Sequence, residues 1–123
     1  MTALEIGKEL VSLGRQGKNR EAIDKLYSPD IVRVEAMEMP NIGQTQQGLE
    51  AVKGKNTWWE QSHEILGRKV DGPYPNGNQF IVHFQYDVTP RHTGTRTTVE
   101  EMGLYTVENG RNAKEEFFDS MGC

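Results

Sequence analysis

Residues 96–118 read Arg-Thr-Thr-Val-Glu-Glu-Met-Gly-Leu-Tyr-Thr-Val-Glu-Asn-Gly-Arg-Asn-Ala-Lys-Glu-Glu-Phe-Phe, and this stretch predicts a β-hairpin. The pair Asn109-Gly110 favours a two-residue type I′ turn, because both residues tolerate the positive φ that this turn needs. The arm before the turn is rich in threonine, valine, leucine and tyrosine, which suit a pleated surface. We therefore expect two long antiparallel strands that meet at Asn109-Gly110.

The first arm of this hairpin carries apolar side chains on both of its faces. Alternation along a strand puts Met102 and Leu104 on one face and Tyr105 on the other. A strand that is apolar on both sides is usually covered on both sides, by its own core and by a second layer. The neighbours Glu100 and Glu101 place one carboxylate on each face, so we expect one of them to be buried, paired or directed into a cavity.

The composition is that of an ordinary globular chain: 123 residues, 35% hydrophobic, 26% charged, with a net charge of −4. We expect residues 1–123 to form one domain, large enough to bury a core. The acidic balance argues against binding to nucleic acid. No apolar stretch approaches the roughly 18 residues of a membrane span, and the N-terminus lacks a signal-peptide pattern, so no membrane partner is expected. The only cysteine, Cys123, cannot form an internal disulfide, which favours the cytoplasm.

Three helices and then a run of strands are expected along the chain. Helical spacing predicts helices near residues 2–14, 19–27 and 49–63, with a capping box at Thr2 and Glu5 and Asn19 as the second cap. Alternation predicts strands at 30–40, 64–71 and 79–89 before the hairpin, with a turn at 72–77. In the first strand, the face of Val32, Val34 and Ala36 is expected to point to the core. This order indicates an α+β fold.

Sequence motifs for the common catalytic and metal-binding sites are absent from the chain. It has no glycine-rich phosphate loop, no His-Glu-x-x-His, no paired cysteines and no Gly-x-Ser-x-Gly. The histidines His63, His83 and His92 do not have metal-ligand spacing. We therefore expect neither a metal nor a cofactor.

Carboxylates on half-buried strands remain as candidates for chemistry, and Glu35 is the best single one. If apolar groups wall it, its pKa rises, and it can then take a proton from a carbon next to a carbonyl. The alternative is a surface pair of Arg33 and Glu35 on an amphipathic strand. For His83 the alternative is a polar outer face that it shares with Gln85 and Asp87.

Three motifs carry a family resemblance across nearly the whole chain, in order: Leu-Tyr-Ser-Pro-Asp-Ile-Val-Arg-Val-Glu at 26–35, Gly-Leu-Glu-Ala-Val at 48–52, and Val-Glu-Asn-Gly-Arg at 107–111 followed by Glu-Glu-Phe-Phe at 115–118. They resemble a SnoaL-like domain of the nuclear transport factor 2-like superfamily, which contains ketosteroid isomerase and polyketide cyclases. The resemblance implies a cone-shaped α+β barrel: a strongly bent antiparallel sheet wrapped around three helices, with a pocket at the wide end. It also implies a homodimer through the outer face of the sheet.

The same resemblance places Glu35, eight residues after Tyr27, at the position of the catalytic carboxylate of ketosteroid isomerase. Gly103 or Met102 stands where that enzyme keeps a protonated aspartate, so its oxyanion hole is not expected here.

Our hypothesis is a protein that binds a small apolar or aromatic carbonyl compound and acts as an isomerase, cyclase or dehydratase without a cofactor. Glu35 would be the base, while His83 and Glu101 would face each other and polarise the substrate oxygen. The residues expected to contact the ligand are Tyr27, Trp59, Phe84, Tyr105, Glu115 and Phe117. The alternative is a non-catalytic ligand-binding or dimerisation module.

Overall fold

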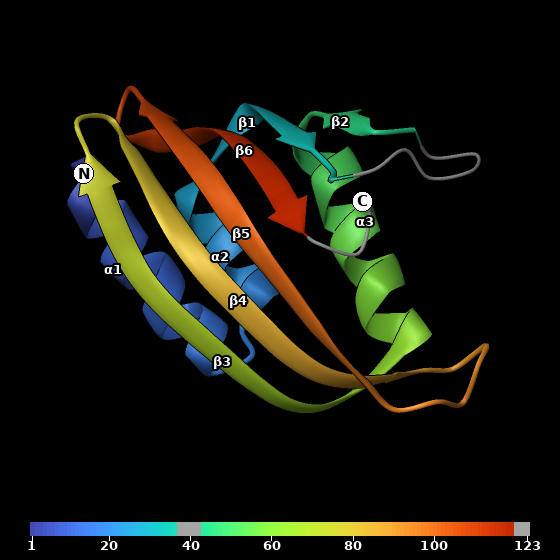
Figure 1. Ribbon diagram of the computed structural model, residues 1–123. Helices are drawn as coiled ribbons and strands as arrows, with labels where there is room; N and C mark the ends of the chain where they lie inside the picture. The colour runs from blue at the N-terminus through green and yellow to red at the C-terminus, as the bar shows by residue number, and fades with distance from the viewer. Residues whose placement is uncertain (37–42, 120–123) are drawn as a thin grey trace.

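The computed structural model describes residues 1–36 and 43–119, and the predicted α+β cone is confirmed within them. Its elements are α1 (Ala3–Arg15), α2 (Asn19–Leu26), β1 (Tyr27–Val34), β2 (Thr45–Gln47), α3 (Leu49–Ser62), β3 (His63–Asn76), β4 (Gln79–Pro90), β5 (Thr97–Glu108) and β6 (Arg111–Asp119). The strands form a bent, unclosed sheet in the order β2-β1-β6-β5-β4-β3. The helices lie on one side of this sheet, with α1 and α2 behind β3 to β5 in the view of Figure 1.

The hairpin that joins β5 and β6 has the predicted turn. Both turn residues have positive φ, 52° at Asn109 and 73° at Gly110, as a type I′ turn needs. The strand pairing puts Tyr105 opposite Glu115 and Glu101 opposite Asp119. The expected separation of the two glutamates is also confirmed, because Glu101 lies on the face that lines the cavity and Glu100 on the exposed face.

The start of α1 is the predicted capping box. The backbone nitrogen of Glu5 donates to the Thr2 hydroxyl at 3.2 Å, and the Thr2 nitrogen donates to the Glu5 carboxylate at 2.9 Å. In contrast, Asn19 is not the cap of α2 but its first residue, and the cap position belongs to Lys18 without a side-chain hydrogen bond.

Three expectations about the strands are wrong. The sheet is not wholly antiparallel, because β1 pairs with β6 in parallel; a long crossover joins these strands, so no tight turn fixes their relative direction. The expected turn at 72–77 is wrong, since β3 does not end at residue 71 but continues to Asn76. Its pairing with β4 has an irregular register between Asp71 and Tyr74. In β1, Ile31 is fully buried while Val32 and Val34 are only half-buried, so the inward face is the opposite of the expected one. Met37, Pro40 and Cys123 lie outside the described residues.

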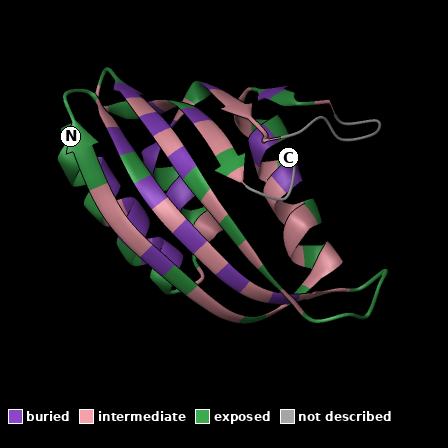
Figure 2. Ribbon diagram, in the orientation of Figure 1, coloured by how far each residue is buried: buried purple, intermediate pink, exposed green. Residues whose placement is uncertain are grey.

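The core lies between the helices and the concave face of the sheet. Along β4 the alternate residues Phe80, Val82, Phe84, Tyr86 and Val88 are buried, a pattern that Figure 2 shows as stripes across the sheet. They pack with the apolar stripes of the helices, and no helix in the described part of the chain is long and apolar enough to cross a membrane. The core fills one end of the cone and leaves a cavity at the end near α3.

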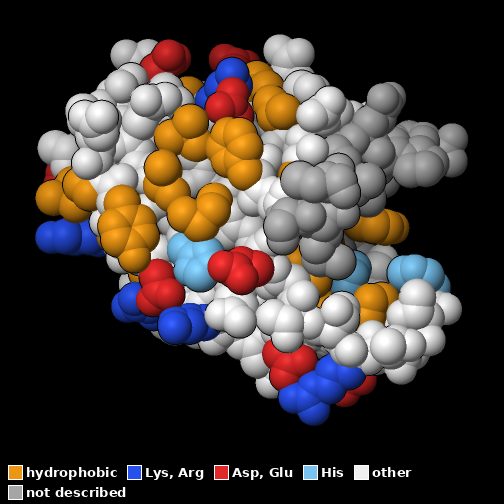
Figure 3. All heavy atoms as spheres, viewed as in Figure 1, with side chains coloured by type: hydrophobic (Ala, Val, Ile, Leu, Met, Phe, Trp, Pro, Cys, Tyr) orange, Lys and Arg blue, Asp and Glu red, His pale blue; other side chains and the backbone are white. Residues whose placement is uncertain are grey.

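The opposite face of the sheet carries an apolar patch. Directly paired residues share a face, and the pairs Tyr74–Ile81 and Met102–Phe118 put four large side chains there. Tyr74 is 57% exposed and Phe118 55%, and Figure 3 shows hydrophobic side chains gathered over these strands. The prediction that β5 is apolar on both sides is therefore confirmed.

Candidate functional site

The candidate site is a cavity of about 340 Å³ bounded by α3, β1 and the concave faces of β4, β5 and β6. Pockets for small molecules typically start at about 300 Å³, so this volume suits a compact ligand. Five of the six residues predicted to contact a ligand line it: Tyr27, Trp59, Phe84, Tyr105 and Phe117. The sixth, Glu115, is not among the lining residues and lies fully buried beside the cavity.

Seven of the 22 residues that line the cavity are phenylalanine, tyrosine or tryptophan. The ring centroids of Phe84 and Tyr86 are 6.0 Å apart, and those of Trp59 and Tyr86 are 5.2 Å apart. Gly103 sits beneath the rings of Tyr105 and Phe117, where an added Cβ would lie 2.8 Å from Tyr105. A side chain at this position would push the rings into the cavity, so glycine keeps the space open. Such a wall favours a flat, apolar ligand.

Glu35 reaches the cavity from the residue that follows β1, and it is not surrounded by apolar groups alone. The Lys55 ammonium lies 3.2 Å from a Glu35 carboxylate oxygen, and the exposed fractions of the two side chains are 7% and 15%. Lys55 also lies over the ring of Trp58, at 5.4 Å from its centroid. The condition that apolar groups wall Glu35 is therefore not met, because a buried ion pair holds its carboxylate in place.

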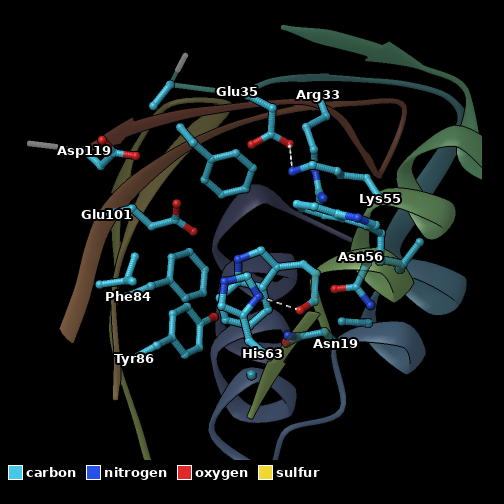
Figure 4. A pocket seen from close by; sticks show the side chains of 18 of the residues that line it. Asn19, Arg33, Glu35, Lys55, Asn56, His63, Phe84, Tyr86, Glu101 and Asp119 are labelled. Carbon is cyan, nitrogen blue, oxygen red and sulfur yellow. Dashed lines mark hydrogen bonds and ion pairs between the residues drawn. The ribbon is translucent and has the colours of Figure 1, made fainter. Parts of the chain in front are cut away.

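The surroundings of Glu101 favour the protonated form of its carboxyl group. Burial, followed by the negative charge of Glu35, raises the pKa of Glu101 to about 7, from an ordinary value of 4.5. The charge of Asp119, the residue opposite Glu101 in β6, acts in the same direction. Figure 4 shows Glu35 and Glu101 at the same end of the cavity. At neutral pH the Glu101 carboxyl is divided between its two forms, so it can both donate and accept a proton.

A second, largely buried ion pair supports the wall beside Glu35. The Arg33 guanidinium donates to the Glu115 carboxylate, and the Tyr27 hydroxyl donates to its other oxygen at 2.5 Å. Burial, followed by the negative charge of Glu115, raises the pKa of Tyr27 well above its usual value, so Tyr27 stays a donor. Arg33 also lies over the Phe117 ring at 5.3 Å. The alternative of a surface Arg33–Glu35 pair is therefore wrong.

His83 lies on the other face of the sheet from the cavity. It is opposite Met102 in β5, whereas Phe84 is opposite Glu101. Its ring contacts Glu100 at 2.7 Å and Asp71 at 3.7 Å, both on the outer face. The expectation that His83 faces Glu101 is wrong because the hairpin register differs from the expected one by one residue, which reverses the face of a side chain. The alternative interpretation, a polar outer face, describes its position.

Sequence reasoning did not place Lys55 or His63 in the site, although both line the cavity. Lys55, Trp59 and His63 are spaced four residues apart and therefore share one stripe at the end of α3, a signal that the sequence contained. Asp119 is two residues beyond Phe117 and lines the same cavity. Within residues 1–36 and 43–119, no group of three or more histidine, cysteine, aspartate or glutamate side chains is arranged to hold a metal ion.

Comparison with known proteins agrees with this geometry. The family model for a SnoaL-like domain matches residues 1–119. A crystal structure of a proposed SnoaL-like polyketide cyclase from Mesorhizobium loti is 46% identical, covers 96% of this chain and 99% of that chain, and has a TM-score of 0.90. The sequence matches none of the curated proteins.

More distant structures share the fold alone. TerC co-crystallised with polyporic acid has a TM-score of 0.74 at 18% identity, over 98% of this chain and 92% of that one. A hypothetical protein from Catenulispora acidiphila with a ketosteroid isomerase-like fold, in complex with trimethylamine, has a TM-score of 0.73 at 19% identity, over 98% and 88%. The match over residues 1–119 and the 46% identical relative show that this chain belongs to the SnoaL-like domain family.

Proposed function

We propose that the protein binds a small, mostly apolar carbonyl compound in the cavity and transfers protons between its carbon and oxygen atoms, as an isomerase or cyclase does. The observation that carries this proposal is the unequal pair of carboxyl groups at one end of an aromatic cavity. Glu35 is paired with the Lys55 ammonium, whereas the pKa of Glu101 is raised to about 7. A carboxylate paired with a cation and a carboxyl group of raised pKa, at one end of a cavity, suit the roles of base and acid.

The charges around the cavity favour a ligand without net charge. Arg33 is neutralised by Glu115, and Lys55 is neutralised by Glu35. Glu101, which lies close to the negative charges of Glu35 and Asp119, would repel an anion. The apolar rings would bind the body of the ligand, and the polar groups would fix its orientation.

The chemistry needs only the side chains of this chain. The Glu35 carboxylate removes a proton from the carbon next to the carbonyl, breaking a C–H bond. Glu101 gives its proton to the carbonyl oxygen, so the product of this half-reaction is a neutral enol. Lys55 keeps donors close to the same place, because an ammonium has three hydrogens and Glu35 uses one of them. If the enol is conjugated with a second double bond, return of the proton from Glu35 to the far carbon gives an isomer, while the enol hydroxyl returns its proton to Glu101. Attack of the enol carbon on a second carbonyl closes a ring: the enol hydroxyl returns its proton to Glu101, and the new alkoxide takes the proton from Glu35.

The test is exchange of the carbon-bound protons of 2-tetralone, an uncharged aromatic ketone, followed by proton NMR in D₂O. We expect the wild type to accelerate the exchange and both Glu101→Gln and Glu35→Gln to lose that acceleration by about 100-fold or more. Glu100→Gln is the matched control, because Glu100 is the neighbouring residue on the outer face. Equal acceleration by the wild type and Glu101→Gln would contradict the proposal.

Ligand binding can be followed separately from exchange. Both tryptophans of the chain, Trp58 and Trp59, line the cavity, so intrinsic fluorescence reports on it directly. We expect 2-tetralone to quench this fluorescence with a similar dissociation constant in the wild type and in Glu101→Gln. That result assigns the loss of exchange to chemistry rather than to binding.

The outer face of the sheet supports a second proposal, assembly into a homodimer. Its exposed Tyr74, Ile81, Met102 and Phe118 lie in two adjacent rows of paired residues. A second copy with the same patch would form the covering layer that an apolar sheet face requires. We expect sedimentation to show a dimer for the wild type and a monomer for Met102→Lys/Phe118→Lys. A monomeric wild type would contradict the dimer and leave the cavity chemistry unaffected.

A further inference from the structure

The cavity has a second polar end, where α3 gives way to β3. His63 caps α3 there, and its ring stacks on the Trp59 indole with centroids 4.5 Å apart and planes 19° apart. The Nδ1 atom of His63 lies 2.9 Å from the backbone carbonyl oxygen of Trp59. A carbonyl oxygen only accepts hydrogen bonds, so Nδ1 is the donor and carries the hydrogen. The end of the helix thus fixes the tautomer of this histidine.

The other ring nitrogen, Nε2, is then a hydrogen-bond acceptor. In the neutral imidazole with hydrogen on Nδ1, Nε2 has a free lone pair and can only accept. Within residues 1–36 and 43–119, the Trp59 carbonyl is the one polar partner of the His63 ring. His63 lines the cavity, and Figure 4 shows it, with Asn19 and Tyr86, at the opposite end from Glu35 and Glu101. The cavity therefore presents an unused acceptor at this end.

The two polar ends are separated by an aromatic wall. Lys55, Trp59 and His63 follow one another along the same stripe, and a helix rises about 1.5 Å per residue. Lys55 and His63 are therefore on the order of 12 Å apart along the axis. Trp59 lies between them on this stripe, and its ring centroid is 5.2 Å from that of Tyr86. A ligand that satisfies both ends has a flat apolar body and a polar group at each extremity.

We propose that His63 is a specificity-determining residue that accepts a hydrogen bond from a hydroxyl group at the end of the ligand remote from the reacting carbonyl. This inference rests on the proposed function and names its substrate class: an uncharged, flat hydroxyketone, such as a phenolic ketone. A site built to accept a hydrogen bond discriminates against a ligand that cannot donate one, because such a ligand covers the acceptor and leaves it without a partner.

The test compares three ligands that differ only at the remote position: 6-hydroxy-2-tetralone, 6-methoxy-2-tetralone and 2-tetralone. Dissociation constants from tryptophan quenching should be roughly 3- to 10-fold lower for the hydroxyl compound than for the methoxy compound. His63→Phe keeps a stacked ring without an acceptor and should remove this preference. His63→Gln keeps an acceptor and should restore part of it. His83→Phe, on the outer face, is the matched control and should leave the preference unchanged.

A second readout follows the acceptor atom itself. In ¹⁵N NMR spectra the Nε2 resonance of His63 should move when the hydroxyl compound is added and stay in place with the methoxy compound. Equal affinities for the hydroxyl and methoxy compounds, in a protein that still exchanges the protons of 2-tetralone, would overturn this inference and leave the proposed function standing. A protein that binds none of the three compounds would contradict both.

Discussion

The Lys55 ammonium donates to a Glu35 carboxylate oxygen at 3.2 Å. This contact links the middle of α3 to the residue that follows β1, 20 positions earlier in the sequence. This ion pair decides how the two glutamates of the cavity differ. Glu35 has a cation beside it, whereas Glu101 has no salt bridge within the described residues and is close to the charges of Glu35 and Asp119. The same cavity therefore holds one carboxylate that is paired with a cation and one carboxyl group whose pKa is raised to about 7.

Replacement of Lys55 by methionine should destabilise the protein through Glu35. The substitution leaves the Glu35 carboxylate buried without its partner, and loss of one member of a buried pair costs about 3–5 kcal/mol. We expect the free energy of unfolding, measured in urea, to fall by about 3 kcal/mol in Lys55→Met. The double variant Glu35→Gln/Lys55→Met should recover part of this loss. Strictly additive effects of the two substitutions would show that the ion pair does not exist.

The enclosed pair of Arg33 and Glu115 should matter more for stability than for binding. Glu115→Gln leaves a buried guanidinium without a counter-charge, so we expect the free energy of unfolding to fall by about 3–5 kcal/mol. Tyr27→Phe removes only the hydroxyl that donates to Glu115 and should cost about 1 kcal/mol. Chemical denaturation measures both values. A Glu115→Gln variant as stable as the wild type would mean that Arg33 is solvated.

The raised pKa of Glu101 makes the stability of the protein depend on pH. Between about 4.5, its ordinary pKa, and about 7, its pKa in the fold, the native state holds a proton that the unfolded chain has released. Stability is therefore lost as the pH rises through this window, by an amount on the order of 3 kcal/mol.

Glu101→Gln should remove this dependence because glutamine stays neutral. We expect it to exceed the wild type in free energy of unfolding at pH 8 and to equal it at pH 4. The same comparison with Glu100→Gln controls for general charge effects. If Glu101→Gln is not more stable than the wild type at pH 8, Glu101 is not strained by burial.

Two glycines should respond in opposite ways to alanine. At Gly103 the new Cβ would lie 2.8 Å from the Tyr105 ring, so we expect Gly103→Ala to destabilise the fold by about 1–3 kcal/mol and to weaken ligand binding. At Gly54, inside α3, the new Cβ meets nothing within 4 Å, and alanine should stabilise the helix by up to about 1 kcal/mol. Thermal melts of the two variants check the signs, and a stabilised Gly103→Ala would contradict the packing described for the cavity wall.

Local patterns predicted the fold well where one residue pair fixes the geometry. Asn109-Gly110 determined the turn, and the alternation in β4 identified its buried face. The neighbours Glu100 and Glu101 had to lie on opposite faces. These results follow because side chains alternate between the two faces of a strand, and because Asn-Gly favours a type I′ turn.

The site was harder to predict because it depends on pairs that are distant in sequence. Arg33 on the inward face of β1 is tolerated only because Glu115 of β6 neutralises it, and no local pattern shows that partner. The inward face of β1 was therefore assigned to valines. In the sequence alone, Lys55 looks like a solvent-exposed residue of a helix, because its partner Glu35 lies on a different element. The position of His83 depended on hairpin register, in which a shift of one residue reverses every side chain.

The proposed chemistry depends on a Glu101 carboxyl group that titrates near neutral pH, at the same end of the cavity as the ion-paired Glu35. Titration of the Glu101 side-chain carboxyl carbon by ¹³C NMR, in the wild type and in Glu35→Gln, tests it most directly. We expect an inflection near pH 7 for Glu101 in the wild type and one at lower pH in Glu35→Gln, where the neighbouring charge is gone. An inflection near pH 4.5 in both proteins would contradict it.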